Sequence, residues 1–126
     1  MINDETEEFK YILATKKLLC IISFIGPLNH TAIRSIQKCH EELKEVDCKL
    51  VALNFRDVTE VGGKIYRDLV QLQNLVRTEK EGFIKVCGMR PAWKTKLVDE
   101  GIIRSAEIVD NIRVAIIELS KLKIEG

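Results

Sequence analysis

The sequence lacks the residues from which most catalytic and metal sites are built. It contains two histidines, His30 and His40, and neither lies in a pattern with a nucleophile and an orienting acid. The four cysteines show no CxxC spacing, and Cys39 and His40 are neighbours, which point about 100° apart on a helix. These absences disfavour a zinc site. We therefore expect a protein that is not an enzyme, with no cofactor, no metal and only free thiols.

The sequence also lacks a charge excess and a long apolar run. Lys and Arg total 20 and Asp and Glu total 19, so the net charge of +1 creates no field that attracts nucleic acid. The longest strongly apolar stretch, LLCIISFIGPL, is too short to span a bilayer. The N-terminus, MINDETEEFK, is acidic where a secretory signal would be basic and then apolar. These features predict a cytoplasmic protein with no nucleic-acid partner and no membrane insertion.

The chain does contain enough apolar sequence for one folded domain. Its 126 residues are 46% hydrophobic and 31% charged, an ordinary balance for a globular protein. A chain of this length can bury a core without disulfides. We expect a single domain over residues 8–122, an N-terminal tail at 1–7 and a C-terminal tail at 123–126.

Strand-like and helix-like patterns alternate along this domain. Apolar runs predict strands at 9–17, 18–24, 49–55, 83–89 and 105–110. Apolar residues at helical spacing predict helices at 32–46 and 64–78, and Pro91 and Gly101 indicate the start and the end of a short helix at 91–100. We expect Asp110 to cap a last helix whose apolar face consists of Ile112, Ala115, Ile116, Leu119 and Leu122. Asn29 and Thr31 are both candidate N-caps of the first helix, and Gly26-Pro27 is expected to end the second strand, which reads as buried on both faces. The order predicts an α/β fold: a mixed, mainly parallel sheet of four to five strands covered by about four helices.

The stretch NFRDVTEVGGKIYRDL, residues 54–69, resembles a phosphate-binding junction because an apolar strand leads through two glycines into a helix. A P-loop would need glycine where Val58 stands and a hydroxyl where Ile65 stands, so that reading fails. Two other readings stay open for Gly62-Gly63. Their amides, with Lys64 and Arg67, can hold an anion, or the glycines only allow a tight turn with φ above zero.

Two carboxylates flank the same turn. Asp57 and Glu60 can be read as a pair that binds magnesium. The commoner role of such residues is to cap turns through hydrogen bonds to the backbone.

Several segments together resemble the STAS domain, the fold of bacterial anti-sigma-factor antagonists, over about residues 8–122. ISFIGPLN is similar to the family strand that ends in Gly-x-Leu-(Asp/Asn). KLVALNFRDVTEV is similar to its third strand, and FIKVCGMRPAWKTKLVDEGI to its fourth strand, turn and following helix. The resemblance implies a signalling role through protein partners.

The resemblance also implies a phosphorylation switch that this sequence lacks. The family typically has Asp-Ser-(Ser/Thr)-Gly before the second helix, where a kinase that is also the anti-sigma factor phosphorylates a hydroxyl. Here the aligned residues are Gly62 to Ile65, or Glu60 to Gly63 with a gap, and neither set contains a hydroxyl. Thr59 is the nearest hydroxyl but stands where the family strand ends. The motif is degenerate.

We therefore predict a non-enzymatic, STAS-like signalling module, similar to an anti-sigma-factor antagonist. It would bind a protein partner, such as a kinase-like anti-sigma factor or a signalling complex, without phosphorylation at the usual site. The alternative is binding of a small anion such as a nucleotide or a lipid headgroup. Residues 8–14 form a candidate edge strand that can pair with another chain, which allows a homodimer. The binding surface, which we name the rim, consists of Asn29, His30, Thr31, Arg56, Asp57, Thr59, Glu60, Gly62, Gly63, Lys64, Arg67 and Arg90.

Overall fold

Five strands form one sheet in the computed structural model, which describes residues 8–122. The strand order is β1-β2-β3-β4-β5, with β1 antiparallel to β2 and the other neighbours parallel. The predicted mixed, mainly parallel sheet is therefore confirmed, and β1 lies at its edge. The expected tails lie outside the described residues. The strands are β1 (Lys10–Lys16), β2 (Leu19–Leu28), β3 (Leu50–Val61), β4 (Phe83–Cys87) and β5 (Ile108–Val109).

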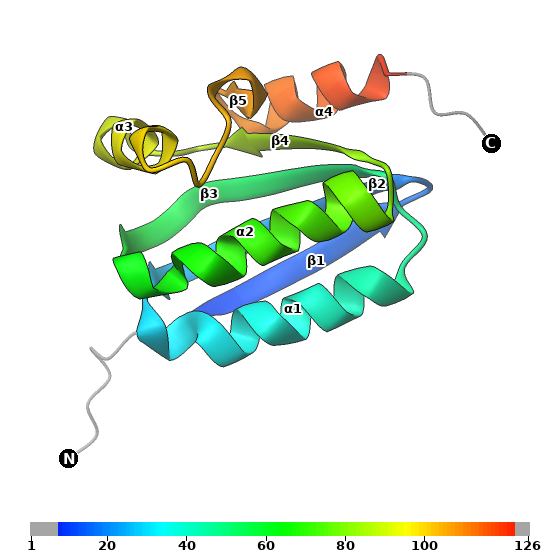
Figure 1. Cartoon of the computed structure of the whole chain (residues 1–126). Coiled ribbons are helices and arrows are strands. Elements are labelled where there is room, and N and C mark those ends of the chain that lie inside the picture. Colours follow the sequence, from blue (N-terminus) through cyan, green and yellow to red (C-terminus); the bar gives the residue numbers. More distant parts are fainter. Residues whose placement is uncertain (1–7, 123–126) are drawn as a thin grey trace.

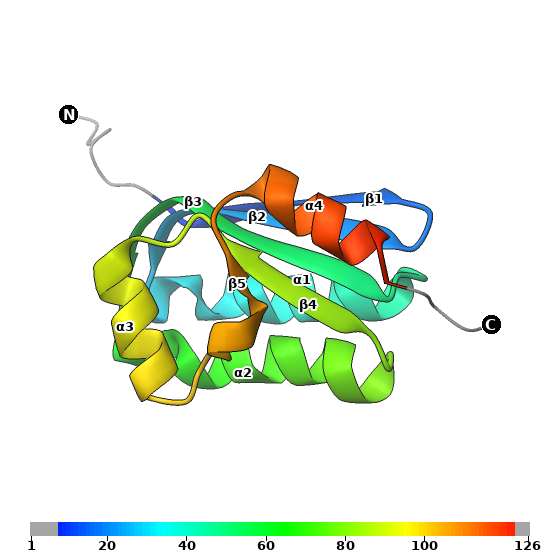
Figure 2. The ribbon, with the colours of Figure 1, turned by 90° about the horizontal axis from the view of Figure 1, so that it is seen from above.

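Helices cover both faces of this sheet. In Figures 1 and 2, α1 and α2 lie side by side on one face, α4 lies on the other, and α3 lies at the end of the domain where β3 ends. A π-helical turn, Leu75–Glu79, extends α2, so the predicted helix at 64–78 is confirmed. The helices are α1 (Ile33–Glu45), α2 (Tyr66–Asn74), α3 (Pro91–Asp99) and α4 (Ile112–Ser120).

The core consists of two layers that the strand alternation separates. Cys20, Ile22 and Phe24 of β2 are fully buried and belong to the layer under α1 and α2. The smaller layer lies under α4 and includes Leu50 and Ala52 of β3. Because α4 packs on β3 and β4, the residues of β2 that face the α4 side stay half-buried. The prediction that β2 is buried on both faces is therefore wrong.

Strand β2 does not end at Gly26-Pro27, contrary to the prediction. It continues to Leu28, since Gly26 adopts φ +95° and two shifts of register carry the strand past the proline. Strand β3 likewise runs past the apolar stretch 49–55 to Val61 as the partner of this extension, as the resemblance of residues 49–61 to the third strand of the family implied. Pairing between β2 and β3 therefore outweighs the local tendency of Gly26-Pro27 to end a strand.

The last helix also differs from the prediction. Asn111, not Asp110, caps α4, because its side chain accepts a hydrogen bond from the Val114 N–H at 3.0 Å. Leu122 lies beyond the end of α4 and is 36% exposed, so it does not belong to the buried face. Ala115 and Leu119 are fully buried on that face, as predicted.

Candidate functional site

The carboxyl ends of β2 and β3 bring distant parts of the rim together. The Gly62 N–H donates to the Leu28 carbonyl at 2.8 Å. Beside it, the Asn29 side-chain amide donates to the Glu60 carboxylate at 3.1 Å. Parallel strands end at the same edge of a sheet, which is where α/β proteins place their binding residues. Asn29, Glu60 and Gly62 therefore form one continuous surface.

Asn29 also shapes the start of the α1 segment. Its Oδ1 accepts hydrogen bonds from the Thr31 N–H at 2.9 Å and from the Thr31 hydroxyl at 2.6 Å. This cap starts a 3₁₀ turn, His30–Ala32, that leads into α1. Of the two candidate caps, Asn29 is the one used. His30 and Thr31 are exposed at this turn, so they lie on the rim surface.

Gly62 and Gly63 do not provide the tight turn that the sequence allowed. Gly62 is extended, with φ −108° and ψ 158°, and neither glycine has a positive φ. A Cβ on Gly62 would meet the Asn29 Cβ at an ordinary 3.5 Å, and one on Gly63 would meet nothing within 4 Å. The backbone therefore does not require glycine at either position. The pair leaves a surface without side chains just before α2.

The charged rim residues differ in whether they are already paired. Arg56 contacts Asp57 at 3.5 Å, and both side chains are exposed. Lys64 and Arg67 are exposed at the start of α2 and make no ion pair within residues 8–122. Their positive charge is available to a ligand. Because Asp57 and Glu60 contact different partners, Arg56 and Asn29, the magnesium reading gains no support.

Arg90 and Thr59 lie at the margins of the rim. Arg90 directly precedes α3, and its guanidinium lies over the Trp93 ring, 4.7 Å from the ring centroid. The preceding Gly88 packs against the backbone of Arg56, so the segment that carries Arg90 continues from the edge where the rim lies. Thr59 is exposed on β3 itself, not at the α2 start.

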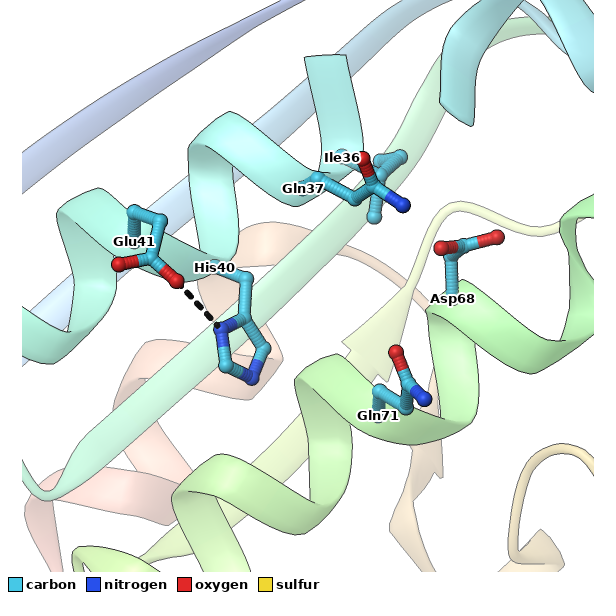
Figure 3. Close-up of a pocket in the computed structure, with 6 residues that line it drawn as sticks. All are labelled: Ile36, Gln37, His40, Glu41, Asp68 and Gln71. Atoms are coloured by element: carbon cyan, nitrogen blue, oxygen red, sulfur yellow. Dashed lines mark ion pairs between the residues drawn. The ribbon is translucent and has the colours of Figure 1, made fainter. Parts of the chain in front are cut away.

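Two adjoining hollows between α1 and α2 extend the rim, and sequence reasoning missed them. One, of about 570 Å³, is lined by Lys64 and Arg67. The other, of about 290 Å³, is shown in Figure 3 with His40 and Glu41 at one end. Asp68 lines both and is 8% exposed. Its place on the apolar side of the helical pattern, three residues after Ile65, was the available signal.

The side chains of this site are suited to binding a partner or ligand more than to catalysing a reaction. No group of three His, Cys, Asp or Glu side chains that could hold a metal occurs in the described part of the chain. The cysteines are buried, and burial raises the pKa of Cys39 to about 12 and that of Cys87 to about 11, which suppresses thiolate formation. No helix within residues 8–122 is long and apolar enough to cross a membrane.

The chain was compared with known proteins. No family model and no curated protein matches it. An anti-sigma factor antagonist from Mycobacterium paratuberculosis superimposes with a TM-score of 0.77 at 10% identity, over 96% of this chain and 100% of that one.

The unphosphorylated anti-sigma factor antagonist SpoIIAA gives a TM-score of 0.73 at 13% identity, over 90% of this chain and 99% of that one. A chain from the structure of the stressosome, described as a signal integration and transduction hub, gives 0.65 at 15% identity, over 86% and 96%. The chain therefore has the STAS fold, the fold of anti-sigma factor antagonists.

Proposed function

We propose that this protein is a non-enzymatic signalling module of the bacterial cytoplasm that binds a protein partner through the rim. The observation that carries the proposal is the exposed charge of Lys64 and Arg67, which form no ion pair with any of residues 8–122 and lie beside a surface that Gly62 and Gly63 leave open. Exposed surfaces that carry charge suit protein partners, since charge complementarity steers association and fixes orientation. The similarity of the fold to anti-sigma factor antagonists and to a stressosome chain supports a regulatory role.

The charge of the rim indicates the chemistry of the partner. The rim has four basic residues and two acidic ones, and both acidic side chains already contact other rim residues. A partner with an acidic surface fits this arrangement. A kinase-like anti-sigma factor or a larger signalling assembly is the class that the fold suggests.

Regulation at this surface would differ from a phosphorylation switch. A phosphate adds nearly two negative charges to an interface and so reverses its electrostatics. Residues 62–65 contain no hydroxyl that can accept one, and Lys64 has the opposite charge to a phosphate mimic. Phosphorylation at residues 62–65 would therefore not switch the binding of the partner on or off.

Comparative affinity capture tests the proposal. The full chain, a Lys64→Glu/Arg67→Glu variant and an Arg113→Glu/Lys121→Glu control, in α4 and at its C-terminal end, would each capture proteins from native lysate for quantitative mass spectrometry. We expect one partner retained by the wild type and the control and lost by the rim variant. Equal recovery by all three chains, or no partner at all, would count against the proposal. The same spectra report whether Thr59 carries phosphate.

Anion binding is the second candidate, and the hollow that Lys64 and Arg67 line favours it. The Asp68 carboxylate in the same hollow opposes it, because it repels an anion at short range. A thermal-shift series with inorganic phosphate, ATP and a soluble phosphoinositide headgroup separates the two. Stabilisation that Lys64→Ala abolishes would support a ligand site, and a flat response would leave the protein-binding proposal.

A further inference from the structure

We propose that two copies of this chain pair antiparallel through strand β1, around a two-fold axis at Ile12. Strand β1 is the edge of the sheet, and no strand within residues 8–122 pairs with its outer side. Ile12 is 57% exposed near the middle of this strand. An edge strand with a central exposed β-branched residue is a template for pairing with another chain. The proposal involves none of the rim residues and does not depend on the proposed function.

Charge selects one register among the possible two-fold pairings. A pairing centred on Leu13 places Lys10 opposite Lys16, and like charges directly opposite are unfavourable. A pairing centred on Ile12 instead places Glu8 opposite Lys16 and Lys10 opposite Ala14. A pairing centred on Tyr11 places Lys10 opposite Ile12 and pairs no opposite charges. Of these three registers, only the one centred on Ile12 joins opposite charges, and the symmetry forms that pair twice.

The two residues before β1 continue its line far enough for this register. Its ladder pairs Lys10 with Ile25, so the two residues before Lys10 continue along β2 toward Pro27. They do so closely, because a Cβ on Gly26 would lie 3.0 Å from the Glu8 carbonyl and 3.4 Å from the Phe9 Cα. Glu8 therefore follows the line of the strand. Because strand alternation continued from β1 gives even-numbered residues the same face, we place the Glu8 side chain on the sheet face of Ile12.

Both faces of β1 offer surfaces that a second copy would cover. On the α4 side, Ile12 adjoins the half-buried Ile21 and Ile25 of β2. On the α1 side, a hollow of about 330 Å³ lies beside Tyr11 and Leu13. The Ile12 register places the partner's Leu13 opposite Tyr11.

Lysines on an edge strand commonly act as guards against pairing. Here the lysines disfavour the Leu13 register, in which Lys10 lies opposite Lys16. They do not disfavour the Ile12 register, in which Lys16 lies opposite Glu8. The interface is small, so we expect a weak dimer that forms reversibly at micromolar concentrations.

Cysteine cross-linking tests the register directly. All four native thiols are buried, so an added thiol on β1 would be accessible while they are not. Residues directly opposite lie about 4.5–5.5 Å apart between Cα atoms, within disulfide range. Ile12→Cys should therefore cross-link under mild oxidation. Ala14→Cys is the matched control, because its two copies are four residues out of register, roughly 13 Å apart.

Measuring the self-association of the full chain tests whether Glu8 and Lys16 pair across the dimer. We expect the mass from light scattering to rise from 14.4 kDa toward twice that value between about 1 and 300 µM. Glu8→Lys and Lys16→Glu should each weaken the dimer about tenfold, the double exchange should restore it, and Lys94→Glu on α3 should have no effect. Thermal unfolding confirms that each variant folds. A monomer at all concentrations, a cross-link at Ala14→Cys instead of Ile12→Cys, or a double exchange that fails to restore association would overturn the proposal.

Discussion

Three glycine-to-alanine substitutions separate backbone conformation from contact and test how the rim is built. Gly63 has no positive φ and open space around its missing Cβ. Gly101 also has open space but adopts φ +76°. Gly88 adopts φ +76°, and a Cβ there would lie 2.7 Å from the backbone nitrogen of Arg56. The three sites therefore differ by one physical factor at a time.

The expected changes in the free energy of unfolding follow from these factors. Gly63→Ala should be neutral or stabilise by about 0.5 kcal/mol, because it reduces the entropy of the unfolded chain without strain. Gly101→Ala should cost about 1–2 kcal/mol, the penalty of a left-handed conformation for an L-residue. Gly88→Ala adds a backbone clash and should cost about 3 kcal/mol or more, since a packed interior yields little.

Urea unfolding followed by circular dichroism measures these differences, provided that the slope of free energy against urea stays constant. A loss at Gly63→Ala equal to that at Gly101→Ala would show that the α2 start requires glycine, and the open-surface account of Gly62-Gly63 would be wrong. Equal losses at Gly88→Ala and Gly101→Ala would show that the close approach of Gly88, which follows β4, to the Arg56 backbone does not contribute to the cost of the substitution.

Three further predictions concern other contacts. Asn29→Ala should lower the unfolding free energy by about 1 kcal/mol, because it removes the cap of the α1 segment; an unchanged melting temperature would contradict this. Glu107→Gln should lower the unfolding free energy by about 1–3 kcal/mol, because it weakens the half-buried ion pair with Arg77. A loss under about 0.5 kcal/mol would mean that this pair does not hold the 3₁₀ turn before β5. The raised pKa of Cys39, about 12 against an ordinary 9.0, means that its neutral thiol stabilises the fold fully below pH 9 and loses this contribution as the pH rises toward 12. Urea titrations from about pH 8 to 10.5 should therefore show a decline that is shallower in Cys39→Ala, by up to about 1.4 kcal/mol per pH unit, and equal slopes would refute the assignment.

The helices and the succession of strands and helices along the chain could be predicted from the sequence because their signals are local. Ile36, Cys39 and Leu43 recur at helical spacing, and the structure buries all three on α1. The apolar run at 49–55 similarly predicted the buried part of β3. Each of these signals depends on a few consecutive residues and on which face they present.

The extensions of β2 and β3 could not be predicted in the same way. Gly26-Pro27 is a strong local breaker, and Arg56 to Val61 is mostly polar. These segments are strands because each supplies the other's hydrogen-bond partners, as in the bond from Gly62 to Leu28. Such pairing depends on residues more than 30 positions apart, which periodicity does not report.

The structure brings the predicted rim residues together at the centre of the rim more than at its margins. Asn29, Glu60 and Gly62 meet because parallel strands end at one edge, a rule that holds before any coordinates are known. The hollows around Asp68 depend on the spacing between α1 and α2, and Arg90 stacks on Trp93 apart from the rest of the rim. Neither arrangement follows from spacing in the sequence.

Titration of the captured partner against purified variants tests the central claim, that the rim binds a protein without a phosphorylation switch. We expect Lys64→Glu/Arg67→Glu to weaken binding about tenfold or more at low salt, with the unphosphorylated wild type and Arg113→Glu/Lys121→Glu binding equally well. Equal affinity of all three chains, or binding by the wild type only after phosphorylation, would contradict the account.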